Sequence, residues 1–207
     1  MAYITIREYG EDSFIEKKSE FIGYAKRVEN EEEAKAFVAE IKSKHKQARH
    51  NCWAYIIGEN MGIQRYSDDG EPQGTAGIPI LEVMKKADIT DCAVVVTRYF
   101  GGILLGTGGL VKAYTQATLE ALGNAVIVEK DFGQEVKFAV NYADFEKLKY
   151  YLKQSNIGII SSEYDANVNV IVEISKGKLE KMLEQKENFN FKLLNYQILR
   201  QKFITVL

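Results

Sequence analysis

The spacing of hydrophobic and polar positions predicts alternating strands and helices over residues 1–130. Short runs that alternate, or that are apolar throughout, are typical of β-strands. We expect strands at residues 3–9, 19–28, 52–58, 62–66, 94–97 and 125–129. Apolar residues at helical spacing predict three helices: one after Asn30, one beginning near Ala76 and one after Gly109. Asn30 and Thr75 are the expected N-caps of the first two.

Beyond residue 134 the pattern is more regular. It predicts strands at residues 135–142, 158–164, 167–174 and 192–206, and helices at residues 144–154 and 178–187. The order βαββαβ is that of a ferredoxin-like sandwich. Residues 130–134 are expected to form a short joint. We therefore predict an α+β protein with two domains, residues 1–130 and residues 135–207.

Composition and charge narrow the functional classes. The 207 residues carry a net charge of −2, with −3 on residues 1–130 (16 Lys and Arg against 19 Asp and Glu) and +1 on the remainder. Neither part would bind nucleic acid by overall charge, so any such contact needs a local patch. With no long apolar run and no export signal, we expect a cytoplasmic protein without a membrane partner. Cys52 and Cys92 are then expected to be reduced thiols.

Residues 94–114, VVVTRYFGGILLGTGGLVKAY, predict a strand, a glycine loop and a helix in succession. This order is typical of an anion site, because glycines leave backbone N–H groups uncovered and a helix N-terminus adds unpaired donors. The letters do not match a P-loop, which needs Gly-Lys-Ser/Thr. They also miss the dinucleotide fingerprint, since Val111 stands where its last glycine belongs. Alternatively, these glycines permit tight turns and close helix–strand packing.

Two further polar clusters invite chemical interpretations. His50 and Cys52 are spaced like zinc ligands or a Cys–His pair, but no second ligand pair is present and Cys52 begins an apolar strand. A packed thiol is the favoured interpretation. Asp68, Asp69 and Glu71 are weak candidates for a magnesium site or for acid–base chemistry. A turn in which the Asp side chains accept from loop N–H groups and cap the next helix is favoured.

Arginines beside tyrosines form a third group of candidates. These are Arg49, Arg65, Arg98 and Lys112, with Tyr66, Tyr99 and Tyr114 nearby in sequence. Arginine and tyrosine at strand ends can contact phosphate and stack on bases. They can equally pair with Asp68, Asp69 and Glu71 in a salt network.

Four segments together resemble a known family: KKSEFIG at residues 17–23, HNCWAY at 50–55, YSDDGEPQGTAGIPIL at 66–81, and residues 94–114. The chain resembles the IMPACT family, also called the YigZ or UPF0029 family, in its two-domain bacterial form. The resemblance implies an N-terminal domain like elongation factor G domain IV and the second domain of a small-subunit ribosomal protein. It implies a ferredoxin-like C-terminal domain.

The resemblance also implies a role in translation. Eukaryotic relatives are translational regulators that use an additional domain to compete for an activator of the starvation-sensing kinase. Bacterial relatives are suspected of binding RNA or the ribosome, and the resemblance carries over no catalytic residue. We therefore expect a non-enzymatic, translation-associated regulator whose N-terminal domain binds RNA, the ribosome or a translation factor, with no cofactor or metal. The expected binding residues are Arg49, His50, Arg65, Arg98, Gly101, Gly102, Gly106, Thr107, Gly108, Gly109 and Lys112.

An enzyme is the alternative hypothesis. In a small-molecule kinase or a hydrolase, the glycine loop would hold phosphate and residues 68–71 a metal. The two hypotheses share one expectation about the glycine loop, namely that its amides face an anion. For the binding protein, we expect Arg98→Ala to remove the partner without unfolding the domain.

Overall fold

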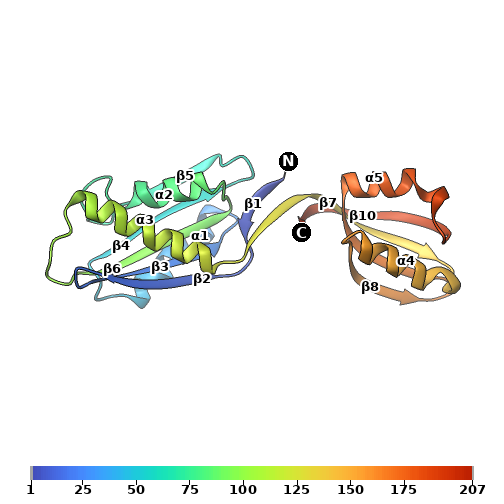
Figure 1. Cartoon of the computed structure of the whole chain (residues 1–207), viewed down its shortest axis with the longest axis horizontal. Helices are drawn as coiled ribbons and strands as arrows, with labels where there is room; N and C mark the ends of the chain where they lie inside the picture. The colour runs from blue at the N-terminus through green and yellow to red at the C-terminus, as the bar shows by residue number, and fades with distance from the viewer. Residues whose placement is uncertain (1, 207) are drawn as a thin grey trace. The chain divides into compact units, whose positions relative to one another are not determined.

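The computed structural model describes residues 2–206 and shows a mixed α/β fold with two antiparallel sheets (Figure 1). Contacts between Cα atoms divide the chain into a unit spanning Tyr3–Val128 and a second unit beginning at Glu129. We refer to them as the N-terminal unit and the C-terminal unit, and describe each by itself.

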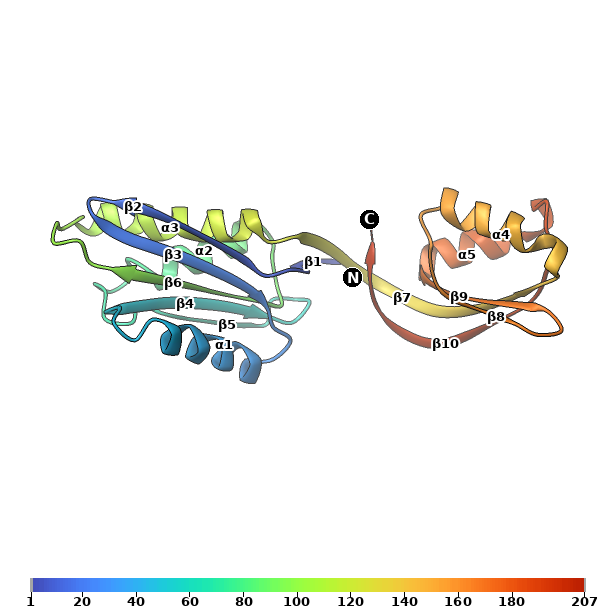
Figure 2. The ribbon, with the colours of Figure 1, turned by 90° about the horizontal axis from the view of Figure 1, so that it is seen from below.

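The N-terminal unit contains a five-stranded antiparallel sheet in the order β2-β3-β6-β4-β5. Figure 2 shows α1 on one face of this sheet and α2 and α3 on the other. The strands of this sheet are β2 (Gly10–Glu16), β3 (Ser19–Arg27), β4 (His50–Ile57), β5 (Ile63–Ser67) and β6 (Cys92–Tyr99). The first strand of the unit, β1 (Tyr3–Ile6), pairs instead with β7 (Ile127–Val140). The helices are α1 (Glu31–Lys44), α2 (Gly77–Lys86) and α3 (Thr107–Asn124).

The central strand β6 is apolar from Cys92 to Val96 because helices cover both faces of the sheet. Val94 and Val96 contribute to the core under α2 and α3, whereas Ala93 and Val95 contribute to the core under α1. Cys52 and Cys92 are fully buried in the first of these cores. Both thiols are free, and burial raises the pKa of Cys92 to about 12.

The C-terminal unit has the predicted order βαββαβ. Its own strands run β10-β7-β9-β8, and each of these three neighbouring pairs is antiparallel. The α4 and α5 helices pack on one face of this sheet, over a core that includes Val136, Phe138, Leu148 and Leu179 (Figure 2). The elements are β7 (Ile127–Val140), α4 (Tyr142–Gln154), β8 (Gly158–Tyr164), β9 (Val168–Ser175), α5 (Lys176–Glu184), a 3-10 turn (Lys186–Asn188) and β10 (Leu193–Val206).

Four details of the prediction are wrong. The strand expected at residues 3–9 ends at Ile6, and β2, which was not predicted, follows it. Residues 130–134 form no joint but lie inside β7, where β10 supplies the pairing partners. The α3 helix begins before Gly109, at Thr107. Thr75 does not cap α2, because three loop and helix N–H groups are satisfied by Asp68 instead.

His45 links α1 to two strands of the N-terminal sheet. It ends α1, is buried, and its ring nitrogens lie 2.5 Å from the Tyr24 hydroxyl and 2.9 Å from the Tyr99 hydroxyl. Burial, together with the Lys44 charge, lowers the pKa of His45, while Glu11 and Glu20 oppose the shift. The neutral ring is thus the form that the folded protein favours.

A lowered pKa in the folded state means that the unfolded chain binds the proton more tightly. The contribution of His45 to the free energy of unfolding is therefore fully present above the unfolded His pKa of about 6.5. This contribution is lost as the pH decreases through that value. We expect the urea midpoint of the N-terminal unit to fall between pH 7.5 and pH 5 by more than that of His45→Gln, whose amide keeps hydrogen-bonding capacity without titrating. Equal pH dependence in both proteins would contradict this assignment.

Candidate functional site

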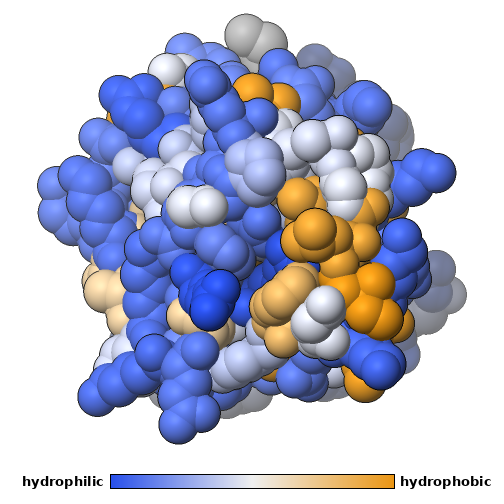
Figure 3. Space-filling model, turned by 90° about the vertical axis from the view of Figure 1, so that its left-hand side faces the viewer, coloured by the Kyte–Doolittle hydropathy of each residue, from blue (hydrophilic) through white to orange (hydrophobic). Residues whose placement is uncertain are grey.

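Antiparallel pairing brings several connections to one end of the N-terminal sheet. Glu16 pairs with Ser19 at the β2–β3 turn, and His50 at the start of β4 pairs with Arg98 near the end of β6. We call this region the loop end and define it as residues 17–18, 49–50, 68–76 and 100–109. In Figure 1 the loop between β6 and α3 marks it at the left. Figure 3 looks onto it and shows hydrophobic side chains gathered beside strongly hydrophilic ones.

A buried ion pair lies beneath the surface of the loop end. The Arg98 guanidinium donates from Nη1 to Oε1 of Glu71 over 2.7 Å, and the two side chains are 6% and 4% exposed. The same carboxylate oxygen accepts from the Tyr114 hydroxyl at 2.8 Å. Burial raises the pKa of Tyr114, which keeps this donor protonated. Arg98 therefore holds the 68–76 loop to the sheet and is not a free surface cation.

The glycine loop has one sealed end and one open end. A Cβ on Gly101 would lie 1.9 Å from the Lys18 carbonyl oxygen, and the Gly101 N–H donates to Ser19 Oγ. Only glycine fits where these two backbones touch. At the other end, Gly106 adopts φ +73° and stands as N-cap of α3 without a side-chain cap, and no acidic residue lies in the first turn.

The open end therefore presents free backbone donors. Gly106, Thr107 and Gly108 are exposed. Among the described residues, the N–H groups of Thr107, Gly108 and Gly109 have no hydrogen-bond acceptor. Such uncapped donors, together with the helix dipole, favour an anion.

A hollow of about 360 Å³ lies between this helix start and the ion pair. Its walls combine apolar side chains with a few polar groups. They are formed by Arg49, His50, Glu71, Pro72, Arg98, Phe100, Leu104, Leu105, Gly106, Thr107 and Leu110.

The acidic residues of the 68–76 loop are already engaged. Asp68 accepts from the N–H groups of Gly74, Ala76 and Gly77, and so caps α2 as the turn interpretation expected. Asp69 accepts from the Asn51 N–H and pairs with Lys42 at 2.6 Å. Over residues 2–206, no three His, Cys, Asp or Glu side chains gather in a way that would hold a metal ion. The enzyme hypothesis therefore finds no metal ligands at these carboxylates.

Cys52 and His50 do not form a reactive pair. The Cys52 side chain is fully buried, donates to the Asp68 carbonyl, and has a pKa that burial raises well above the ordinary thiol value. The His50 ring uses Nδ1 to contact the Asp69 carbonyl oxygen at 3.0 Å. Because a carbonyl only accepts, this geometry places a ring proton on Nδ1, so that Nε2 is an acceptor when the ring is neutral.

The predicted site residues separate into two groups. Arg49, His50, Arg98, Gly106 and Thr107 line the hollow, and Gly101, Gly102, Gly108 and Gly109 belong to the same loop and helix start.

Arg65 and Lys112 lie elsewhere. Arg65 pairs across the strands with Tyr55, and its Nε lies 3.9 Å from Glu31 of α1, so it belongs to the opposite face of the sheet. Lys112 is exposed on α3 and does not line the hollow. Burial of the Arg98 guanidinium against Glu71 argues against the expectation that Arg98→Ala spares the fold.

Two cations at the loop end were missed by sequence reasoning. Lys17 and Lys18 form the β2–β3 turn, are exposed, and make no ion pair with any residue in the described range 2–206. The Lys18 backbone touches Gly101, which places this turn beside the glycine loop. The signal was available, because both lysines open the KKSEFIG segment. Phe100 and Leu104, which are exposed at 42% and 81%, were missed as well.

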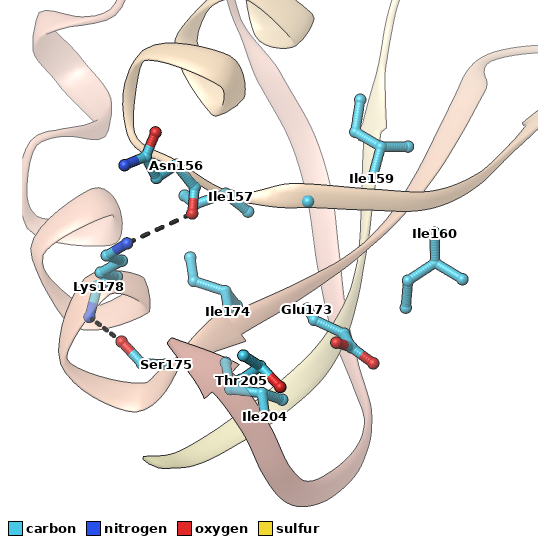
Figure 4. A pocket seen from close by; sticks show the side chains of 11 residues that line it. Asn156, Ile157, Ile159, Ile160, Glu173, Ile174, Ser175, Lys178, Ile204 and Thr205 are labelled. Atoms are coloured by element: carbon cyan, nitrogen blue, oxygen red, sulfur yellow. Dashed lines mark hydrogen bonds between the residues drawn. The ribbon is translucent and has the colours of Figure 1, made fainter. Parts of the chain in front are cut away.

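A second hollow, of about 300 Å³, lies in the C-terminal unit between the starts of β8 and α5 (Figure 4). Its two charged side chains already have partners in the protein. The Lys178 ammonium donates to the carbonyls of Ser155 and Asn156 at 3.1 and 3.4 Å, and Glu173 pairs with Lys202. Isoleucines supply most of the remaining wall.

Comparison with known proteins identifies the family. A profile described as the Impact N-terminal domain matches residues 17–122, and a domain of unknown function matches residues 138–185. The IMPACT family member YvyE of Bacillus subtilis is 41% identical over 92% of this chain and 83% of its own. YigZ of Escherichia coli, also named an IMPACT family member, is 37% identical over 84% of this chain and 86% of its own.

A solved structure also matches almost the whole chain. The crystal structure of a hypothetical protein with 32% sequence identity aligns with a TM-score of 0.62, covering 96% of this chain and 98% of the other. Within the described range, no helix is both long and apolar enough to cross a membrane. The profile match over half of the chain and the two bacterial relatives confirm the resemblance seen in the sequence: this protein belongs to the IMPACT family.

Proposed function

We propose that this protein is a non-enzymatic, translation-associated regulator that binds RNA, free or within the ribosome, through the loop end. The proposal rests on one observation above others: the exposed, uncapped start of α3 lines the same hollow as Arg49, an exposed cation with no acidic partner within residues 2–206. The family resemblance supports the link to translation. We further propose that the N-terminal unit is like elongation factor G domain IV and that the C-terminal unit is ferredoxin-like, consistent with its β10-β7-β9-β8 order.

Charge at the loop end favours a phosphate backbone. Lys17, Lys18 and Arg49 are exposed and make no ion pair with other residues of the described chain. A protein of net charge −2 repels a polyanion on average, so such a local cluster must supply the attraction. Phosphate on the α3 donors and on these cations would position the RNA without reading its sequence.

Neutralising these cations should weaken RNA binding and flatten its salt dependence. For the triple variant Lys17→Gln, Lys18→Gln, Arg49→Gln, three lost phosphate contacts reduce the magnitude of the slope of log affinity against log salt by about 2 to 3. Fluorescence anisotropy with structured RNA and with ribosomal subunits, between low and moderate salt, measures this slope.

A matched variant removes three exposed cations away from the loop end: Arg65→Gln, Lys86→Gln, Lys112→Gln. It should leave the slope nearly unchanged. Equal losses in both triple variants would refute the assignment of the surface. Binding of the wild type no stronger than that of a control protein of equal isoelectric point would refute the function itself.

A further inference from the structure

We propose that the hollow at the loop end seats one unpaired nucleotide, with its phosphate at the start of α3 and its base against Phe100 and Leu104. This deepens the proposed function, on which the choice of RNA as the source of the nucleotide rests. The ligand class itself is argued from the hollow.

The hollow has the dimensions and chemistry of a small-molecule site. Its 360 Å³ lies near the lower end of the range for such sites, about 300 to 1,000 Å³. Pro72, Leu105 and Leu110 supply apolar wall, and the polar groups gather at Arg49, His50 and the α3 start. A ligand that fits must therefore combine an anionic group with a flat or apolar part.

The anionic part is drawn to the helix start. Gly106 and Thr107 line the hollow, and the first-turn N–H groups are unpaired within the described chain. An independent observation comes from Arg98, which is 5% exposed and also lines the hollow. Its Nε is buried without a hydrogen-bond partner, although its Nη atoms reach Glu71 and Ser19. Glu71 balances the guanidinium charge, so what Arg98 adds beside the helix dipole is one unsatisfied N–H donor.

The flat part is drawn to Phe100. The Arg98 guanidinium carbon lies 5.4 Å from the Phe100 ring centroid and steadies the ring by a cation–π contact. The ring nevertheless remains 42% exposed, and Leu104 beside it is 81% exposed. An exposed, supported aromatic ring is a stacking platform for a base. His50 Nε2 is the free acceptor at the same wall.

An unpaired nucleotide satisfies both parts, whereas a base within a duplex does not reach a hollow. Stacked and paired bases expose only their edges, and only an unstacked nucleotide can insert its face between side chains. A peptide ending in an apolar residue and a free carboxylate is the competing occupant. It would use the helix start, but its apolar side chain would not stack on Phe100 as the face of a base does.

Titration with AMP tests the proposal directly. In ¹H–¹⁵N spectra of the full chain, AMP should shift the amides of Gly106, Thr107 and Gly108, whereas adenosine and inorganic phosphate should each bind at least ten-fold more weakly. Phe100→Leu keeps an apolar side chain but removes the stacking ring, so it should weaken AMP binding about ten-fold or more. Ile103→Ala is the matched control, because Ile103 is exposed in the same loop but does not line the hollow.

RNA separates this inference from the proposed function. Wild type should prefer a duplex with one bulged nucleotide over the perfect duplex, and Phe100→Leu should lose this preference while keeping the salt slope. If wild type binds AMP at the hollow but no RNA, the proposed function fails and the nucleotide seat stands. Absence of AMP shifts at millimolar concentration, equal AMP affinity for Phe100→Leu and wild type, or shifts induced only by a peptide carboxylate would each overturn the inference.

Discussion

Replacing Arg98 with methionine is expected to lower the free energy of unfolding of the N-terminal unit by about 3 to 5 kcal/mol. The substitution keeps an unbranched apolar stem but leaves the Glu71 carboxylate buried without its cation. Of the two donors to Oε1 of Glu71, only the Tyr114 hydroxyl remains. An uncompensated buried charge is the reason for the large effect. Urea unfolding followed through Trp53, the single tryptophan, reports on this unit.

A double-mutant cycle identifies the ion pair as the cause. Arg98→Met with Glu71→Gln removes both charges, so the double variant should be more stable than the sum of the single effects predicts, by about 0.5 to 3 kcal/mol. Lys26→Met is a matched control on β3, since its pair with Glu40 is exposed and is expected to contribute under about 1 kcal/mol. Additive effects of the two substitutions would contradict the coupling.

Asp68→Ala is expected to destabilise the same unit by about 2 kcal/mol, at the upper end for a lost helix cap. One carboxylate accepts from three N–H groups, those of Gly74, Ala76 and Gly77, at 2.8 to 3.0 Å. Alanine leaves all three without that acceptor, and the start of α2 has no side-chain cap from its own N-cap residue. The loss should therefore exceed that of an ordinary exposed Asp.

Asp68→Asn distinguishes hydrogen bonding from charge. Its amide oxygen still accepts at the Oδ1 position, where Ala76 and Gly77 donate, but its NH₂ group cannot accept from Gly74. We expect its urea midpoint to lie between those of wild type and Asp68→Ala. A midpoint equal to that of wild type in Asp68→Ala would show that the loop N–H groups find other acceptors.

Local patterns were sufficient for most elements. The α1 helix was predicted from Asn30 and the spacing of Phe37 and Ile41, and the structure shows the Asn30 side chain accepting from the Glu33 N–H. The order βαββαβ of the C-terminal unit was predicted from the hydrophobic period, which changes between that of a strand and that of a helix along the chain. By contrast, β2 was missed because its sequence, GEDSFIE, is polar and lies at an exposed sheet edge, where no apolar face marks a strand.

The candidate site depended on contacts that local patterns do not encode. Arg98 has the letters of a surface cation at a strand end, yet its partner Glu71 stands 27 residues earlier in a loop. Arg65 neighbours Glu31 and so lies on the face of the sheet that α1 covers. The sequence separation between Arg65 and Arg49 does not reveal on which face each side chain lies. Lys17 and Lys18 join the site only because strand pairing brings the β2–β3 turn to the glycine loop. Pairing register, and not composition, assembles the loop end.

The two buried thiols can report the opening of the N-terminal unit. Both cysteines of the chain are enclosed in the core of the N-terminal unit, and the C-terminal unit has none. An alkylating reagent therefore reacts with either sulfur only after that core opens. In the closed core, burial keeps both thiols in the unreactive protonated form. The rate of cysteine labelling, measured by mass spectrometry, then reports how often the N-terminal unit opens. It carries no contribution from the C-terminal unit, which has no cysteine.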